Sequence, residues 1–161
     1  MSGPAELILG EYRRTLDQRF RLAIPGQLVE QLAATESQCV LAKERPGCLS
    51  LWNAEVWTRE LNQGIELVRQ KIAAGKLQGR TGQVQMLGRL LSTRHREIQI
   101  GDRDRLLLPE GFREFLGVEP AAEVMVIGAA ICIEIWKPER WIHYLSGRMP
   151  KFRRLFEQLS G

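Results

Sequence analysis

The feature that most constrains the fold of this chain is an internal repeat. Residues recur unchanged at a constant spacing of 84 positions, without a gap. They are Arg19, Arg21, Pro25, Cys48, Trp52, Glu55, Trp57 and Leu61, which return as Arg103, Arg105, Pro109, Cys132, Trp136, Glu139, Trp141 and Leu145. Such agreement indicates a duplication. Because a unit of about 50 residues is marginal as an isolated domain, we expect the two copies to share one core with interleaved strands and pseudo-twofold symmetry.

Each copy predicts the same order of elements: a strand or tight hairpin closed by proline, a short helix, a β-hairpin and a second helix. Asn53 is expected to cap the first long helix, and Pro138 to open its counterpart. In the first copy the predicted elements cover residues 15–24, 26–32, 39–42 with 48–52, and 54–74. In the second they cover residues 99–108, 110–116, 124–127 with 131–136, and a helix from 138. The hairpins are expected to turn at 45–47 and near Gly128.

The expected organisation is a single structural domain with four parts. These are a first repeat at 8–61, a basic, helical and glycine-containing connector at 62–91, a second repeat at 92–147 and a C-terminal helix at 148–161. The connector is basic, since residues 67–96 contain seven basic and no acidic side chains. Its glycines, between Gly75 and Gly88, predict a flexible or bent segment. Whether this basic stretch is a solvated helix face or an auxiliary phosphate contact is left open.

The repeated arginines are the candidate binding residues. Arg19 and Arg21 are two apart on a predicted strand and would share one face, as would Arg103 and Arg105. Such a surface suits double-stranded DNA, whose phosphates attract arginine; the plain alternative is a set of solvated arginines protecting a strand edge. Further positive charge comes from Arg13 and Arg14. Asp17 is expected to cap a turn by accepting hydrogen bonds from its own backbone.

These residues carry a resemblance to a known family. The opening Gly10-Glu11-Tyr12, Leu16-Asp17, Arg21 and Ile24-Pro25, with the second set ending at Leu108-Pro109 and Glu134-Ile135-Trp136, resembles the two-repeat MraZ family over about residues 8–147. The resemblance implies an α+β, mainly β fold: an AbrB-like swapped-hairpin β-barrel with flanking helices. It also implies a ring-shaped homo-oligomer that binds direct repeats in the promoter of the division and cell-wall gene cluster and represses transcription, with Arg21 and Arg105 contacting DNA.

The chain departs from the family pattern at three positions. Phe20 and Asp104 stand where the family usually has glycine, and Gly101 replaces the motif aspartate that Asp17 retains. Glycine there permits a turn with positive φ, which phenylalanine disfavours and aspartate tolerates better. Because Asp104 also adds negative charge beside Arg103 and Arg105, we expect the second copy to bind DNA less well than the first.

Other functions are disfavoured by composition and motifs. The 161 residues carry a net charge of +4 and an ordinary globular composition, and the longest apolar run, 124–133, is too short to span a membrane. No motif predicts an enzyme, a metal site, a cofactor or a small-molecule substrate. The N-terminal residues lack a signal-peptide pattern and the three cysteines look like buried thiols, so a cytoplasmic, nucleoid-associated protein is expected. The alternatives are an AbrB-like or antitoxin-type regulator with another target, and a ring-forming scaffold that has lost DNA reading.

Overall fold

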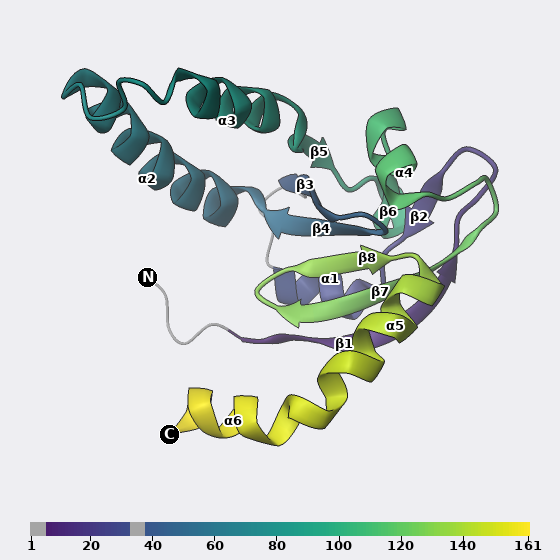
Figure 1. Ribbon diagram of the computed structural model, residues 1–161. Helices are drawn as coiled ribbons and strands as arrows, with labels where there is room; N and C mark the ends of the chain where they lie inside the picture. Colours follow the sequence, from purple (N-terminus) through teal and green to yellow (C-terminus); the bar gives the residue numbers. More distant parts are fainter. Residues whose placement is uncertain (1–5, 33–37) are drawn as a thin grey trace.

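The computed structural model describes residues 6–32 and 38–161 (Figure 1). Residues 1–5, on which the signal-peptide expectation largely depends, lie outside this range. The described chain is α+β, with a mostly antiparallel sheet and several helices. Its strands are β1 (Ile8–Thr15), β2 (Arg21–Ala23), β3 (Gln38–Arg45), β4 (Cys48–Asn53), β5 (His95–Gln99), β6 (Arg105–Leu107), β7 (Glu123–Ala130) and β8 (Ile133–Trp136). Its α-helices are α1 (Gly26–Leu32), α2 (Ala54–Ala73), α3 (Thr81–Thr93), α4 (Glu110–Leu116), α5 (Pro138–Arg148) and α6 (Phe152–Ser160).

The strands of the two copies are interleaved. The main sheet has the order β1-β7-β8-β4-β3-β5, and β2 pairs with β6 in a separate two-stranded sheet. This order is unchanged when each strand is exchanged for its counterpart in the other copy, so β1 of the first copy lies on the hairpin of the second, and β5 does the converse. Since β1 and β5 are the two ends of the main sheet, the described strands do not form the closed barrel that the resemblance implies.

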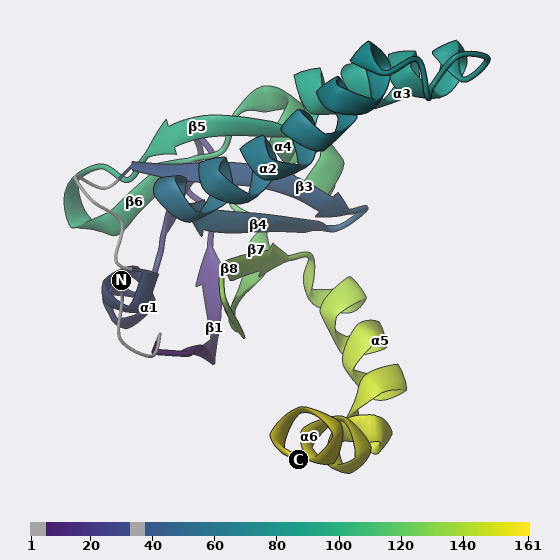
Figure 2. The same cartoon turned by 90° about the vertical axis from the view of Figure 1, so that its left-hand side faces the viewer.

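The central strands of the main sheet, β3, β4, β7 and β8, are buried on both faces because different elements cover each side, whereas the edge strands β1 and β5 are more exposed. One face carries the large core, in which Leu22, Leu106 and Ile133 have no exposed surface; α1, α4 and the β2–β6 pair cover it. On the other face Trp141 of α5 packs against Trp136, and Trp57 of α2 packs against Val40 and Ala42. These three tryptophans are therefore packing residues. Figures 1 and 2 show α2–α3 and α5–α6 leaving the sheet as two separate arms.

Several local predictions are confirmed. The helices α1 and α4 have the predicted bounds, and Gly117 ends α4 at φ 80°. Asn53 caps α2, because its side-chain oxygen accepts hydrogen bonds from the backbone N–H groups of Glu55 and Val56. All three cysteines are buried free thiols. Burial raises the pKa of Cys39 to about 11 and that of Cys132 to about 12, so both stay protonated at neutral pH.

Two local details differ from the predictions. Residues 75–88 bend at a turn over 74–79 but are not flexible throughout, since α3 begins at Thr81 and continues past Gly82 and Gly88. The second hairpin turns at residues 131–132 rather than near Gly128. Gly128 lies within β7 opposite Gly10 of β1, and a Cβ at Gly128 would come within 2.6 Å of the Ile8 carbonyl oxygen. This glycine is required by the close approach of two strands and not by a turn.

Candidate nucleic-acid interface

The sequence predicted a strand or a tight hairpin at each repeated arginine pair, and the structure shows a turn followed by a short strand. Arg19 lies in the turn between β1 and β2, and Arg21 opens β2. In the second copy Arg103 lies in a 3₁₀ turn, Asp102–Asp104, and Arg105 opens β6. The alternation argument that placed both arginines of a pair on one strand face is therefore wrong, because only the second arginine of each pair is in a strand.

The two strand arginines nevertheless share a surface. In the antiparallel β2–β6 pair, Arg21 lies opposite Leu107, and Ala23 opposite Arg105. Opposite residues of a pair point to the same face, and so do residues two apart along a strand. Arg21 and Arg105 are therefore diagonal neighbours, with Cα atoms about 7–8 Å apart by standard strand geometry, while Leu22 and Leu106 point into the core.

The turn arginines extend this arrangement at both ends. Because β2 and β6 run in opposite directions, Arg19 precedes Arg21 at one end of the pair and Arg103 precedes Arg105 at the other. We call the β2–β6 pair with these four residues the arginine ribbon. Arg19 and Arg103 are exposed, and Arg21 and Arg105 are half-buried. Within the described residues, Arg19, Arg103 and Arg105 form no ion pair.

Asp17 organises the first turn. Its Oδ1 accepts hydrogen bonds from the backbone N–H groups of Arg19 (2.8 Å) and Arg21 (2.9 Å), and its Oδ2 accepts one from Arg21 Nε at 2.9 Å. These bonds, led by the one from the Arg21 backbone, hold the pKa of Asp17 below its ordinary value. The second turn has Gly101 at this position and lacks the carboxylate. The first turn therefore fixes the direction of its arginine more firmly than the second.

The residues that replace the family glycine adopt the conformation that glycine would favour. Phe20 has φ 60° and Asp104 has φ 56°, both in the left-handed region. The Arg113 guanidinium packs over the Phe20 ring at 4.2 Å from its centroid, which helps to hold this residue in place. The Phe20 carbonyl accepts a hydrogen bond from Leu108 N, and the Asp104 carbonyl accepts one from Ile24 N. The two turns therefore extend the β2–β6 pair symmetrically.

Arg13 and Arg14 do not join the ribbon. They lie on β1, in the main sheet, and point to opposite faces. Arg13 forms a 3.1 Å ion pair with Glu123, and the Arg14 guanidinium stacks 5.4 Å above the Tyr12 ring. Two neighbours of the site were not predicted from the sequence. Leu107 is exposed between the ribbon arginines, and Arg113, which packs on Phe20, has no repeat signal because its counterpart is Val29.

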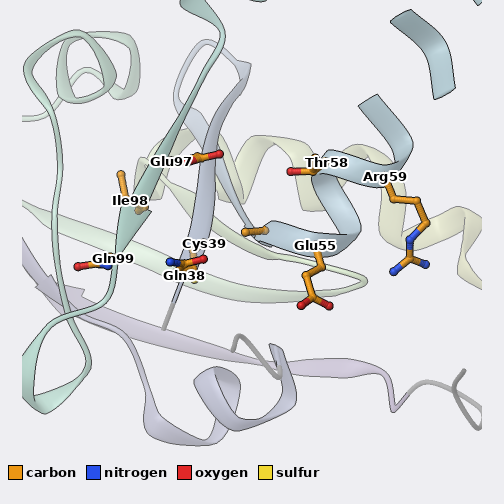
Figure 3. A pocket seen from close by; sticks show the side chains of 9 residues that line it. Gln38, Cys39, Glu55, Thr58, Arg59, Glu97, Ile98 and Gln99 are labelled. Atoms are coloured by element: carbon orange, nitrogen blue, oxygen red, sulfur yellow. The ribbon is translucent and has the colours of Figure 1, made fainter. Parts of the chain in front are cut away.

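The structure also contains an open hollow of about 750 Å³ beside β5 (Figure 3). Side chains of β3 and β5 line one side, and Glu55, Thr58 and Arg59 of α2 line the other. Its one thiol, Cys39, has a raised pKa and is a poor nucleophile. Across the described part of the chain, no group of three or more His, Cys, Asp or Glu side chains could hold a metal ion. No described helix is long and apolar enough to cross a membrane.

Known proteins related to this chain are regulators of transcription by name. The family model described as "MraZ protein, putative antitoxin-like" matches residues 92–158. A Heliobacterium modesticaldum protein named "Transcriptional regulator MraZ" is 28% identical over 153 residues, covering 95% of this chain and 96% of that protein. Proteins of the same name from Thermoanaerobacter sp. (27% identical; 96% and 97% covered) and Roseiflexus castenholzii (29%; 87% and 87%) are similarly related. Residues 92–158 thus match the MraZ family model, and the chain is similar to proteins named MraZ along nearly its whole length, which confirms the family resemblance drawn from the sequence.

Proposed function

We propose that the protein is a sequence-specific DNA-binding transcriptional regulator. By its resemblance to MraZ, it acts as a repressor of the division and cell-wall gene cluster, binding direct repeats in the promoter. It would act in the cytoplasm on the nucleoid, need no cofactor and perform no catalysis. The names of the related proteins support a regulator of transcription.

The observation that carries this proposal is the arginine ribbon. The major groove of DNA accepts a two-stranded β-ribbon, and arginine is the side chain that most often reads guanine there. Arg21 and Arg105 lie on one exposed strand face, and Arg19 and Arg103 extend the row beyond each end. With Asp17 bound to Nε, the Nη groups of Arg21 remain available for a base edge or a phosphate. We assign base or phosphate contact to Arg21 and Arg105, and phosphate contact to Arg19 and Arg103; Arg13 and Arg14 are secondary candidates.

The two halves of the ribbon differ in charge. The first turn has Asp17 against Arg19 and Arg21, whereas the second has Asp102 and Asp104 against Arg103 and Arg105. The carboxylate of Asp104 lies close to Gly26, the first residue of α1. Its Oδ2 is 3.3 Å from the point where a Cβ on Gly26 would stand. Since the summed charge sets the attraction to phosphate, the first half is expected to contribute more of the affinity.

The finer architecture is part of the proposal. Exchange of β1 and β5 between the repeats, together with the β2–β6 pair, supports an AbrB-like swapped-hairpin arrangement. The division into repeats at 8–61 and 92–147, with a connector and a C-terminal helix, accords with this view. We also propose a ring of identical chains. Because four arginines support only modest, salt-sensitive binding per chain, a ring would gain strength by engaging several direct repeats.

The test is a titration of operator DNA at several salt concentrations. Arg21→Ala is expected to weaken binding by about 1–3 kcal/mol and relax specificity if Arg21 reads a base. If it contacts only phosphate, binding to all sequences weakens alike and the salt slope falls by about one. Arg59→Ala, which removes the same charge from α2, is the matched control and should bind like the wild type. Unchanged affinity and slope for Arg21→Ala contradict both versions.

Two alternatives can be separated from this proposal. The first is an AbrB-like or antitoxin-type regulator with another target; selection of bound sequences from random duplexes would then recover a site absent from the division cluster. The second is a ring-forming scaffold without DNA reading, which the substitutions at Phe20, Gly101 and Asp104 motivate. Fluorescence anisotropy decides here, since the scaffold would show no saturable binding to any selected duplex even at low salt.

A further inference from the structure

The outward face of the arginine ribbon presents two apolar side chains as well as two arginines. Leu107 lies opposite Arg21, and Ala23 lies opposite Arg105. The side chain of Leu107 is 56% exposed, and Ala23 is exposed as well. The duplication makes Ala23 and Leu107 counterparts, 84 positions apart. Each strand arginine of the ribbon therefore has one apolar neighbour on the facing strand.

Leu107 stands close to Arg21 because of its place in the hydrogen-bond ladder. The backbone N–H of Leu108 donates to the carbonyl oxygen of Phe20 at 3.0 Å, which makes positions 20 and 108 a hydrogen-bonded pair. Positions 21 and 107 are then a non-hydrogen-bonded pair, in which the Cα atoms are about 4.5 Å apart and the side chains are closest. Successive base pairs of DNA are about 3.4 Å apart. In the major groove, Arg21 and Leu107 would therefore meet the same base pair or adjacent ones.

The chemistry of this pair matches that of two base edges. In the major groove guanine presents two acceptors, N7 and O6, which arginine binds with two hydrogen bonds. Thymine presents an apolar C5-methyl group, which apolar side chains contact. A surface that only neutralised phosphates would gain nothing from an exposed leucine beside Arg21. Arginine next to leucine instead suits a guanine next to a thymine.

We propose that Leu107 is a specificity-determining residue, which packs on the C5-methyl group of a thymine next to the guanine that Arg21 reads. This contact rests on the DNA binding proposed above and adds what one half of the ribbon recognises. Ala23 offers Arg105 only a single methyl group, which reaches less far into the groove. The contact is therefore made on the Arg21 side of the ribbon alone.

The difference between Leu107 and Ala23 gives the ribbon a direction. The pseudo-twofold axis of the duplication passes through Leu22 and Leu106, which are counterparts and lie opposite each other. A ribbon with two equal halves would read a palindromic site, as twofold-symmetric proteins do. Here Leu107 and the carboxylate of Asp17 are both on one side of the axis. The site is consequently asymmetric and is read in one orientation, which direct repeats require.

The first test combines Leu107→Ala with removal of the thymine methyl group. The probe is the duplex that wild-type protein selects from random sequences, with deoxyuridine in place of each thymine in turn. At a thymine beside the guanine whose recognition Arg21→Ala relaxes, deoxyuridine should weaken wild-type binding about three- to fivefold, the effect of one buried methyl group. Leu107→Ala should weaken binding to the thymine duplex by a similar factor and no longer respond to deoxyuridine.

A matched control is Leu9→Ala. It removes a leucine of equal exposure (57%) from another strand, β1, and should respond to deoxyuridine as the wild type does. Circular dichroism reports whether each variant is folded, and sedimentation velocity reports its mass.

The second test is a gain of function. Ala23→Leu gives both arginines of the ribbon a leucine neighbour. Repeated selection from random duplexes with this variant should recover a second thymine, on the other side of the site, and sites that are closer to palindromes. Selected sites identical to those of the wild type would contradict the role given to these two positions.

The outcomes separate this contact from the proposed function. Sequence-dependent binding that Leu107→Ala leaves unchanged, or an equal response of wild type and Leu107→Ala to deoxyuridine at every position, overturns the thymine contact and leaves the regulator standing. A Leu107→Ala chain of lower mass that still responds to deoxyuridine also overturns the contact, in favour of a protein surface as the partner of Leu107. No sequence-dependent binding by the wild type overturns the proposed function and this contact with it.

Discussion

At the scale of single residues, the second turn combines backbone strain with a proposed function. Arg103 has φ 59° and ψ 32°, in the left-handed region that glycine adopts without a steric penalty. It is exposed and forms no ion pair among the described residues. Nothing in its own packing explains the strained conformation. We relate it to the position of the guanidinium at the end of the arginine ribbon, since strain of this kind is often retained at functional sites.

Two substitutions at Arg103 should therefore separate stability from DNA affinity. Arg103→Gly should be more stable than Arg103→Ala by about 1 kcal/mol, because alanine keeps the left-handed strain that glycine relieves. Both variants should lose the same DNA affinity, since both lose the guanidinium. Urea unfolding and operator titration measure the two effects. Equal stability of the two variants would show that the turn is not strained at this residue.

Asp17 gives the first turn a dependence on pH. Its pKa is lowered by hydrogen bonds from the Arg21 backbone, the Arg19 backbone and the Arg21 side chain. A carboxyl whose folded pKa lies below its unfolded pKa stabilises the fold at pH values above the unfolded pKa, about 4, and this stabilisation is lost as pH falls through the folded pKa.

The wild type should consequently lose stability as the pH is lowered below about 4, and Asp17→Asn should lack this part of the loss. The variant should be less stable than the wild type at pH 7, because it no longer accepts the charged bond from Arg21. Carboxyl carbon NMR gives the titration midpoint of Asp17, and thermal unfolding gives the stability. A midpoint at or above that of an unfolded aspartate contradicts the prediction.

At the scale of elements, glycines with different surroundings predict opposite effects of one substitution. Gly128→Ala should destabilise the fold by about 1–3 kcal/mol, because the new methyl would overlap the β1 backbone near Ile8 and Leu9. Gly88→Ala on α3 has nothing within 4 Å and should stabilise by about 0.5–1 kcal/mol, through helix propensity. Urea unfolding compares the two. If Gly88→Ala destabilises, its segment does not behave as the helix that the structure shows.

Some elements could be predicted from local sequence patterns, and others could not. The bounds of α1 and α4 follow from Leu28 and Leu32, and from Phe112 and Leu116, since local spacing alone decides a short amphipathic helix. The sequence could not decide between a strand and a tight hairpin after Thr15, because Phe20 itself gives no glycine signal for its left-handed turn. Gly128 was assigned to a turn since its true partner, β1, is more than 100 residues away in the sequence. A local sequence pattern cannot predict long-range contacts of this kind.

The sequence predicted part of the candidate site, because the internal repeat relates residues that are far apart along the chain. The repeat correctly brought Arg21 and Arg105 to one face, although the strand argument was valid only for these two. Their common face follows from pairing between β2 and β6, which the duplication implies and single-strand alternation does not. Arg13 and Arg14, by contrast, were chosen by charge alone, and the structure places them on β1 in local contacts.

At the scale of the whole molecule, Figure 1 shows α2–α3 and α6 projecting away from β2 and β6. In the proposed ring, contacts between copies that lie away from β2 and β6 would leave the ribbon of each copy free for DNA. A ring would then present its ribbons in a regular array. Direct repeats in DNA are the matching substrate, because a head-to-tail contact relates neighbouring copies by the same rotation, as direct repeats are related by translation.

The proposed ring predicts how affinity depends on the number of repeats. Wild-type protein should bind a duplex with two direct repeats about 10²–10⁴ times more tightly than one with a single repeat, through effective concentration. Half a helical turn inserted between the repeats should weaken this binding, because neighbouring ribbons would then meet opposite sides of the duplex. Anisotropy titrations on the three duplexes measure these affinities, with Arg59→Ala as the control variant that retains the gain. Equal affinity for one repeat and for two would contradict cooperation between neighbouring copies.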